Sequence, residues 1–287
     1  ALPILELFVM AREETDLENL ETMIQKGQKP YYRPDLERLL NNLGVTAGDT
    51  LILHTSLKSF GYLIGGAAML IDTVLNCIGP EGTLVMPSQS VNNMNPKFWQ
   101  YPPVPQDWHD DIRETMLPYD PQRTPVDDAL GAVVAYFYRY PNVHRSAHPL
   151  YSFCAYGRDA EKIVENHPLD YGLGTESPLQ KLYDAGAKIL MLGTTFETNT
   201  SLHLAEYFAN RPDIEESAPV LVDGKKQWVS FKNVDLDIFD DFLDVQKEFF
   251  QKYADQIKQC SLPNGEAYCF SMRDCVDFAK AYYQVKG

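Results

Sequence analysis

The sequence has few cysteines, and they form no recognisable framework. An odd number of cysteines without a CxxC pair predicts neither a set of disulfides nor a zinc knuckle. We therefore expect reduced, mostly buried thiols. The five are Cys77, Cys154, Cys260, Cys269 and Cys275.

Basic residues and long apolar runs are also scarce. Lys and Arg number 25 against 40 Asp and Glu, which leaves a formal charge of −15. This excess of acid argues against a nucleic-acid surface and favours a cationic small molecule as the ligand. The apolar opening, residues 1–10, lacks a basic flank and is too short to span a bilayer. We expect a cytoplasmic protein that makes no membrane contact.

Short β-rich runs recur along the chain, at residues 50–54, 82–87, 151–157 and 187–192. Helical patterns lie between several of them, and this alternation predicts an α/β fold. Between the first two runs, apolar residues of 66–78 fall at helical spacing until Gly79 and Pro80 end the helix.

The other segments are less regular. Residues 92–128 are crowded with proline and aromatic residues, which predicts a long, functional excursion from the sheet. A hairpin turning at Asp223 and Gly224 follows, then an acidic amphipathic helix around 238–258 and a last strand and helix. We predict an N-terminal extension or helix of unknown role over 1–33 and a single domain over 34–287.

The stretch "HTSLKSFGYLIGG", residues 54–66, is the first that can carry chemistry. A buried strand opens into hydroxyls and Lys58, and Gly65 and Gly66 then start a helix. Backbone N–H groups at a helix N-terminus beside a lysine suit a phosphate ligand. An ordinary glycine-bearing turn would have the same composition.

Two further stretches place polar residues beside strands and turns. Residues 140–157 contain His144, Arg145 and His148 ahead of a strand, where binding groups gather in open α/β sheets. Around 170–182, Ser177 and Pro178 have the order of an N-cap and first helical residue. Beside them, Asp170 and Glu176 are placed to meet an ammonium group.

The fourth stretch, "NTSLHLAEYF" at residues 199–208, places His203 three residues before Glu206. On a helix both fall on the polar face, and residues three apart can touch. Glu206 can then hold one tautomer of His203 and stabilise its protonated form. No third ligand is evident at helical spacing, so we expect no metal. A solvent-facing pair would have the same spacing.

Taken together, the motifs resemble the aminoglycoside 3-N-acetyltransferase family, over roughly residues 34–285. The resemblance rests on six segments in the family's order and spacing: "HTSLKSFGYLIGGA", "GPEGTLVMPSQS", "PKFW" with "PPVP", "YPNVHRSAHPLYSFCAYG", "GTESPLQKLYDAGAKILMLG" and "NTSLHLAE". It implies a three-layer α/β/α sandwich with a mixed central sheet and a C-terminal hairpin and helix elaboration. It also implies that 34–287 is an acetyltransferase domain that uses acetyl-CoA.

The resemblance also implies roles for individual residues. His203 matches the family's catalytic base and Glu206 the glutamate that orients it. The residues that match its coenzyme A-binding stretch are Thr55, Ser56, Leu57, Lys58, Ser59 and Gly61. Arg145 and Ser146 are assigned to the cofactor, and His148, Asp170 and Glu176 to the substrate. The expected acceptor is an aminoglycoside or another polyamine, and the protein is expected to be a monomer or a homodimer.

Several alternatives stay open at the level of sequence. The oxyanion of the tetrahedral intermediate needs donors, and these are backbone N–H groups of 54–61 or the hydroxyl of Thr194 or Thr195. An acyl-enzyme on Cys154 is disfavoured because an alternating apolar strand is a poor place for a thiolate. Rival functions are a same-fold acetyltransferase of another amine, a metal-dependent hydrolase using His203 with His144 or His148, and a protein that only sequesters aminoglycosides.

Overall fold

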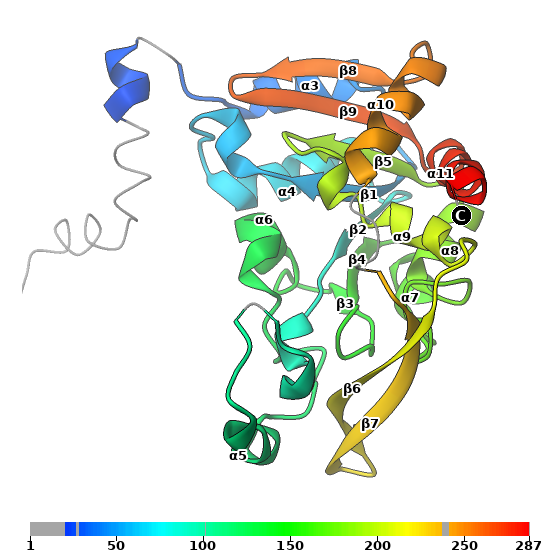
Figure 1. Cartoon of the computed structure of the whole chain (residues 1–287). Coiled ribbons are helices and arrows are strands. Elements are labelled where there is room, and N and C mark those ends of the chain that lie inside the picture. The colour runs from blue at the N-terminus through cyan, green and yellow to red at the C-terminus, as the bar shows by residue number, and fades with distance from the viewer. Residues whose placement is uncertain (1–20, 27–28, 101, 237–240, 287) are drawn as a thin grey trace, which may run out of the picture.

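A seven-stranded mixed sheet forms the centre of the molecule (Figure 1). The computed structural model describes residues 21–26, 29–100, 102–236 and 241–286. The strands stand in the order β3-β4-β2-β1-β5-β9-β8. Their bounds are β1 Thr50–Thr55, β2 Thr83–Pro87, β3 His144–Arg145, β4 Phe153–Gly157, β5 Lys188–Leu192, β8 Lys258–Leu262 and β9 Gly265–Ser271.

The direction of the strands confirms the expected mixed sheet. Strand β1 runs parallel to both β2 and β5. Strand β4 pairs antiparallel with β2, and β9 pairs antiparallel with β5. The carboxyl ends of β1 and β5 therefore lie side by side, where ligand sites form in open α/β sheets.

Helices cover both faces of this sheet, which confirms the three layers (Figure 1). Alternation along β1 divides the core, because Leu51 and Leu53 join one apolar cluster and Ile52 joins the other. The first cluster packs under α3 Arg33–Asn42, α4 Gly66–Ile78 and α6 Gly131–Phe137. The second packs under α7 Ala160–Val164, α8 Pro178–Asp184, α9 Ser201–Glu206, α10 Phe242–Lys252 and α11 Met272–Lys286.

A separate hairpin and the 92–128 excursion extend away from the sheet (Figure 1). The hairpin joins β6 Asp213–Val222 to β7 Lys225–Val234. Asp223 and Gly224 have φ of 50° and 73°, so the turn lies where we predicted it and has the positive φ angles of the tight hairpin class. The excursion contains α5 His109–Thr115 and packs on β6 through Tyr119 N–H, which donates to the Pro219 carbonyl at 2.8 Å.

Some predicted boundaries were wrong. The helix expected over 238–258 is α10, which ends at Lys252, and residues 237–240 lie outside the described part of the chain. Residues 258–262 form β8 instead, at the sheet edge. The strand expected from residue 151 begins at Phe153 because the chain turns at 148–151.

The described residues ahead of α3 pack against the domain. Tyr31 N–H donates to the Tyr62 carbonyl at 2.8 Å, and the Tyr31 carbonyl accepts from Ile64 N–H at 3.0 Å. The Tyr31 and Phe60 rings meet edge to face, with centroids 5.4 Å apart. The predicted extension over 1–33 is thus tied to the domain at residue 31, and its residues 1–20 lie outside the described part. No described helix is both long and apolar enough to cross a bilayer.

Candidate active site

Two loops meet where β1 and β5 end. Ser56 N–H donates to the Leu192 carbonyl at 2.9 Å, and Ser59 Oγ donates to the Gly193 carbonyl at 3.0 Å. A Cβ on Gly193 would lie 2.1 Å from the Ser59 side chain, and Gly193 has a φ of 75°. Only glycine fits there, because a side chain would both clash and strain the backbone. This close approach fixes the loop 55–61 against the segment that leads into α9.

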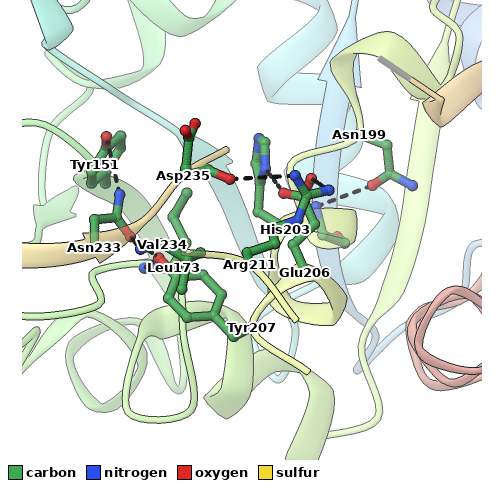
Figure 2. A network of polar contacts seen from close by, with 11 residues as sticks. Tyr151, Leu173, Asn199, His203, Glu206, Tyr207, Arg211, Asn233, Val234 and Asp235 are labelled. Atoms are coloured by element: carbon green, nitrogen blue, oxygen red, sulfur yellow. Dashed lines mark hydrogen bonds and ion pairs between the residues drawn. The ribbon is translucent and has the colours of Figure 1, made fainter. Parts of the chain in front are cut away.

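Helix α9 carries the predicted pair. Asn199 Oδ1 accepts the Ser201 N–H, the first N–H of the helix, at 3.2 Å. His203 Nδ1 lies 2.6 Å from Glu206 Oε2, which confirms that the two can touch (Figure 2). The His203 side chain is 24% exposed and that of Glu206 is 0% exposed. The expected polar face is therefore not a solvent face: Glu206 lies inside, and His203 reaches outward.

This geometry sets the tautomer of His203. An ionised Glu206 accepts a hydrogen bond, so His203 Nδ1 carries the proton and Nε2 keeps its lone pair. A neutral imidazole with a free lone pair and an oriented ring is the arrangement of a general base. The Phe242 ring, with its centroid 5.3 Å from that of His203, holds the imidazole from the α10 side.

The structure adds a third charged residue that we did not predict from the sequence. Arg211 Nη2 lies 2.6 Å from Glu206 Oε1, and neither side chain has exposed surface (Figure 2). Arg211 Nη1 also donates to the Asp235 carbonyl at 3.3 Å. A cation paired with the inner carboxylate is thus held between α9 and the end of β7.

A second histidine, His54 on β1, lies close enough to interact with His203 electrostatically. It points to the same face as Ile52, which is the face that α9 covers. It is 6% exposed, and its Nε2 has no hydrogen-bond partner among the described residues. Burial and the neighbouring His203 lower the pKa of His54 to about 3. It is therefore neutral at ordinary pH.

The predicted coenzyme A loop is well ordered by its neighbours. Residues Thr55, Ser56, Leu57 and Gly61 are partly buried, Ser59 is buried, and Lys58 is exposed. Asn264, in the β8–β9 turn, donates to the Lys58 and Ser59 carbonyls at 3.1 and 2.9 Å. The loop thus presents one exposed cation, Lys58, and its backbone is held by the hydrogen bonds from Asn264. We did not single out Asn264 from the sequence.

Arg145 and Ser146, which the resemblance assigns to the cofactor, are both held by hydrogen bonds within the protein. Arg145 lies in β3, and its guanidinium donates to Ser152 Oγ at 3.0 Å, to Ser90 Oγ at 2.8 Å and to two carbonyls. Ser146 is 1% exposed, and its Oγ accepts the Phe153 N–H at 2.9 Å. Both side chains thus connect the chain at β3 to neighbouring segments, and their role as cofactor ligands stays a prediction.

His148, which the resemblance assigns to the substrate, lies in the interior of the structure. Its side chain has no exposed surface, and Nδ1 accepts the N–H groups of Leu150 and Tyr151 at 3.1 and 3.0 Å. Nε2 must then carry the proton, which it donates to the Leu169 carbonyl at 3.1 Å. Burial lowers the pKa of His148 to about 4. His148 is a neutral, buried residue whose ring packs at a tilt of 39° against that of His167, with ring centroids 4.9 Å apart.

The two predicted substrate acids do share a pocket. Asp170 and Glu176 are exposed and line a surface pocket of about 630 Å³ beside Ser230 and Phe231 of β7. His203 is not among the residues lining it. Asp170 Oδ1 also accepts the Lys232 N–H at 2.8 Å, which anchors the pocket wall to the hairpin. Their role as substrate ligands stays a prediction.

The remaining candidates separate by their environments. Thr195 Oγ1 donates to Glu197 at 3.0 Å, whereas Thr194 Oγ1 is buried without a described partner. The hydroxyl of Thr194 is therefore the better placed of the two to meet a ligand. Burial raises the pKa of Cys154 to about 11, which opposes a thiolate there. Among the described residues, no three His, Cys, Asp or Glu side chains are arranged to hold a metal ion.

Comparison with known proteins gives concordant matches. The family model for aminoglycoside 3-N-acetyltransferases matches residues 52–284. A relative from Bacillus subtilis (strain 168), the SPbeta prophage-derived aminoglycoside N(3')-acetyltransferase-like protein YokD, is 36% identical over 271 residues, or 92% of this chain and 96% of that protein. Its crystal structure has a TM-score of 0.83 to this one, covering 89% of this chain and 94% of that one, at 37% identity.

Two similar structures hold ligands. A structure described as AAC-IIIb binary with CoASH has a TM-score of 0.80 at 28% identity, covering 90% of this chain and 98% of the other. A structure described as AAC-VIa bound to sisomicin has a TM-score of 0.78 at 26% identity, covering 90% and 99%. The first therefore contains coenzyme A and the second an aminoglycoside.

Proposed function

Because this chain belongs to the aminoglycoside 3-N-acetyltransferase family, whose members are acyltransferases, we propose that it acetylates the 3-amino group of the deoxystreptamine ring of aminoglycosides. Acetyl-CoA is the donor, and acetylation of the drug confers antibiotic resistance. The observation that supports this most directly is the pair on α9, with its inner carboxylate fully buried and its outer imidazole 24% exposed. A cytoplasmic location follows from the use of acetyl-CoA and is part of the same proposal.

The donor binds at the carboxyl ends of β1 and β5. The loop 55–61 supplies Lys58 as a counter-charge for the anionic coenzyme, and the hydrogen bonds from Asn264 hold that loop in place. The similar structure that contains CoASH supports a coenzyme A site in this fold. No metal takes part in the proposed reaction.

The acceptor is a polycation, which suits a chain with a formal charge of −15. Asp170 and Glu176 on the pocket beside β7 attract its ammonium groups. The structure with bound sisomicin supports an aminoglycoside as acceptor. The 3-amino position follows from the family to which the chain belongs.

In the proposed mechanism, the acceptor ammonium first loses one proton to solvent, because an ammonium group has no lone pair for attack, and His203 Nε2 then takes a second proton from the nitrogen of the neutral amine as it attacks. The amine nitrogen bonds to the thioester carbonyl carbon, and the carbonyl electrons move to oxygen. When the tetrahedral intermediate collapses, the carbon–sulfur bond breaks, and coenzyme A leaves as a thiolate that accepts the proton from His203. Glu206 keeps the ring oriented and stabilises the imidazolium.

Replacing His203 by Ala tests the assignment of the base. We expect kcat for coenzyme A release with gentamicin-class acceptors to fall roughly 10²- to 10⁴-fold, because a general base typically contributes that much. His144→Gln is the matched control, since His144 is exposed on β3. Near wild-type turnover by a folded His203→Ala variant would disprove the role of His203 as the base.

The runner-up function is acetylation of a different amine by the same site. Mass spectra of an aminoglycoside panel after incubation with acetyl-CoA, with the acetyl group located by NMR, separate the two. Acetylation at the 3-amino group and raised resistance of expressing cells are expected from our proposal. Coenzyme A release with other amines but with no aminoglycoside would favour the alternative.

A further inference from the structure

Arg211 is buried directly behind the catalytic pair. Its Nη2 lies 2.6 Å from Glu206 Oε1, while the other carboxylate oxygen, Oε2, lies 2.6 Å from His203 Nδ1. The guanidinium and the imidazole thus contact opposite oxygens of one carboxylate (Figure 2). The exposed fraction is 0% for Arg211 and Glu206 and rises only at His203.

The guanidinium is held by contacts from outside α9. Its Nη1 donates to the Asp235 carbonyl, just beyond the end of β7, and its Cζ lies 5.7 Å from the centre of the Tyr283 ring on α11. An arginine stays protonated at all accessible pH values and pairs with carboxylates through its planar fork. Arg211 is therefore a permanent positive charge at a fixed place beside Glu206.

A buried carboxylate needs a neighbouring positive charge to stay ionised at low cost. Without Arg211, the charge nearest to Glu206 would have to be a protonated His203. The resting site would then be an imidazolium–carboxylate pair, and its imidazolium would have no lone pair to accept a proton. With Arg211 present, the carboxylate is already paired, and His203 can rest in its neutral form.

We propose that Arg211 is a positioning residue that pairs with Glu206 so that His203 rests neutral, with Nε2 free to take the proton of the acceptor amine. This inference rests on the proposed function, and it adds a residue that acts through Glu206 without touching substrate. The proton that leaves the amine nitrogen forms a new N–H bond at Nε2 and later passes to the coenzyme A sulfur. Arg211 itself neither gains nor loses a proton.

The other titratable groups around the pair do not supply this charge. His54 on β1 has a pKa lowered to about 3 by burial and by His203, so it is neutral. Burial and Glu206 raise the pKa of Tyr283, so that phenol is also uncharged. Asp241, next to the Phe242 that packs on His203, is acidic and adds negative charge. The guanidinium of Arg211 therefore provides the compensating positive charge.

The test is the pH profile of kcat/KM for Arg211→Met and Arg211→Lys. An opposite charge within hydrogen-bonding distance typically moves a titration by roughly one to three pH units. In the pH profile of Arg211→Met, we expect the acidic limb to move to higher pH by about that amount. At pH 7, kcat/KM should fall roughly 10- to 1000-fold and should recover as the pH is raised. Arg211→Lys should move the limb less, since it keeps the positive charge.

Arg273→Met is the matched control. Arg273 is exposed on α11 and donates to the Tyr183 and Asp184 carbonyls, so its loss should leave the limb in place. An acidic limb that stays at its wild-type pH in a folded Arg211→Met variant would overturn the inference. So would a loss of rate that is equal at every pH, because that is the result of a purely structural role.

A second measurement does not depend on turnover. Nitrogen-15 NMR of the His203 ring in the wild type should show Nδ1 protonated and Nε2 unprotonated at neutral pH. Arg211→Gln serves as the variant if Arg211→Met does not fold. In Arg211→Gln, the His203 ring should keep its second proton to higher pH than in the wild type. A His203 ring that titrates alike in both proteins overturns the inference even if acetyl transfer is confirmed. Failure to acetylate any amine, with the NMR difference present, overturns only the proposed function.

Discussion

His54 is a buried imidazole whose Nε2 has no hydrogen-bond partner among the described residues. An unsatisfied buried polar atom costs about 1–3 kcal/mol of stability. We therefore expect His54→Leu to raise the free energy of unfolding at pH 7 by about 1–2 kcal/mol, measured by urea denaturation.

His148→Leu provides the opposite control. Its Nδ1 accepts two backbone N–H groups, from Leu150 and Tyr151, which leucine would leave unpaired. That variant should lose stability, by roughly 2 kcal/mol or more. A His54→Leu variant less stable than the wild type would show that the ring of His54 makes a contribution that its hydrogen bonds do not reveal.

The individual site residues show where prediction from the sequence stops. The contact of His203 with Glu206 follows from their spacing on a helix, and the structure confirms it. Arg211 was missed because it lies five residues beyond Glu206, after α9 has ended, where helical periodicity no longer applies. Its approach depends on the irregular segment between α9 and β6, where Arg211 N–H donates to the Ala209 carbonyl at 2.9 Å, and helical periodicity does not predict such a path. The sequence likewise did not predict the burial of His148. Its imidazole has the chemistry of a binding group, but the side chain lies in the core.

Lys226, at the start of β7, joins the hairpin to the excursion. Its Nζ donates to three carbonyls at the end of α5, those of Arg113, Glu114 and Met116. A cation at a helix C-terminus also interacts favourably with the helix dipole. We expect Lys226→Met to loosen this end of α5 and to speed amide hydrogen exchange of residues 109–116, with a small loss of global stability because Lys226 is exposed.

Lys225→Met is the matched control for that experiment. Lys225 is the neighbouring exposed lysine, on the other face of β7, and should leave exchange in α5 unchanged. Equal exchange in α5 in all three proteins would mean that Trp228 Nε1, which donates to the Arg113 carbonyl at 3.1 Å, holds the helix by itself.

Among the helices and strands, prediction succeeded where the apolar pattern is strong. The central strands β1, β2 and β5 are buried along most of their length and were predicted close to their observed bounds. We did not predict strand β8. Only Leu262 is buried in it, so its sequence lacks the alternation of apolar and polar residues that predicts a strand. An edge strand is held by hydrogen bonds to a single neighbouring strand. Here residues 258–262 pair antiparallel with β9.

Three of the six histidines are buried and neutral, and this makes the folded protein sensitive to acid. Burial lowers the pKa of His54 to about 3 and of His148 to about 4, and burial with the neighbouring His148 lowers the pKa of His167 well below its usual value. Each folded value lies below the value near 6.5 of the unfolded chain, so the unfolded state takes up protons first as the pH falls. Stability is thus fully present above pH 6.5 and declines below it.

The expected loss between pH 7 and pH 5 is about 2 kcal/mol for each of His54 and His148, before most carboxylates titrate. These two groups together remove about 4 kcal/mol, a large share of the 5–15 kcal/mol that a typical domain has, and His167 acts in the same direction. Urea denaturation at pH 7, 6 and 5 measures this decline directly. His54→Leu should reduce it by about 2 kcal/mol, whereas His144→Gln, at an exposed position, should leave it unchanged. A free energy of unfolding that is flat from pH 7 to pH 5 would contradict the neutral, buried state of these three rings.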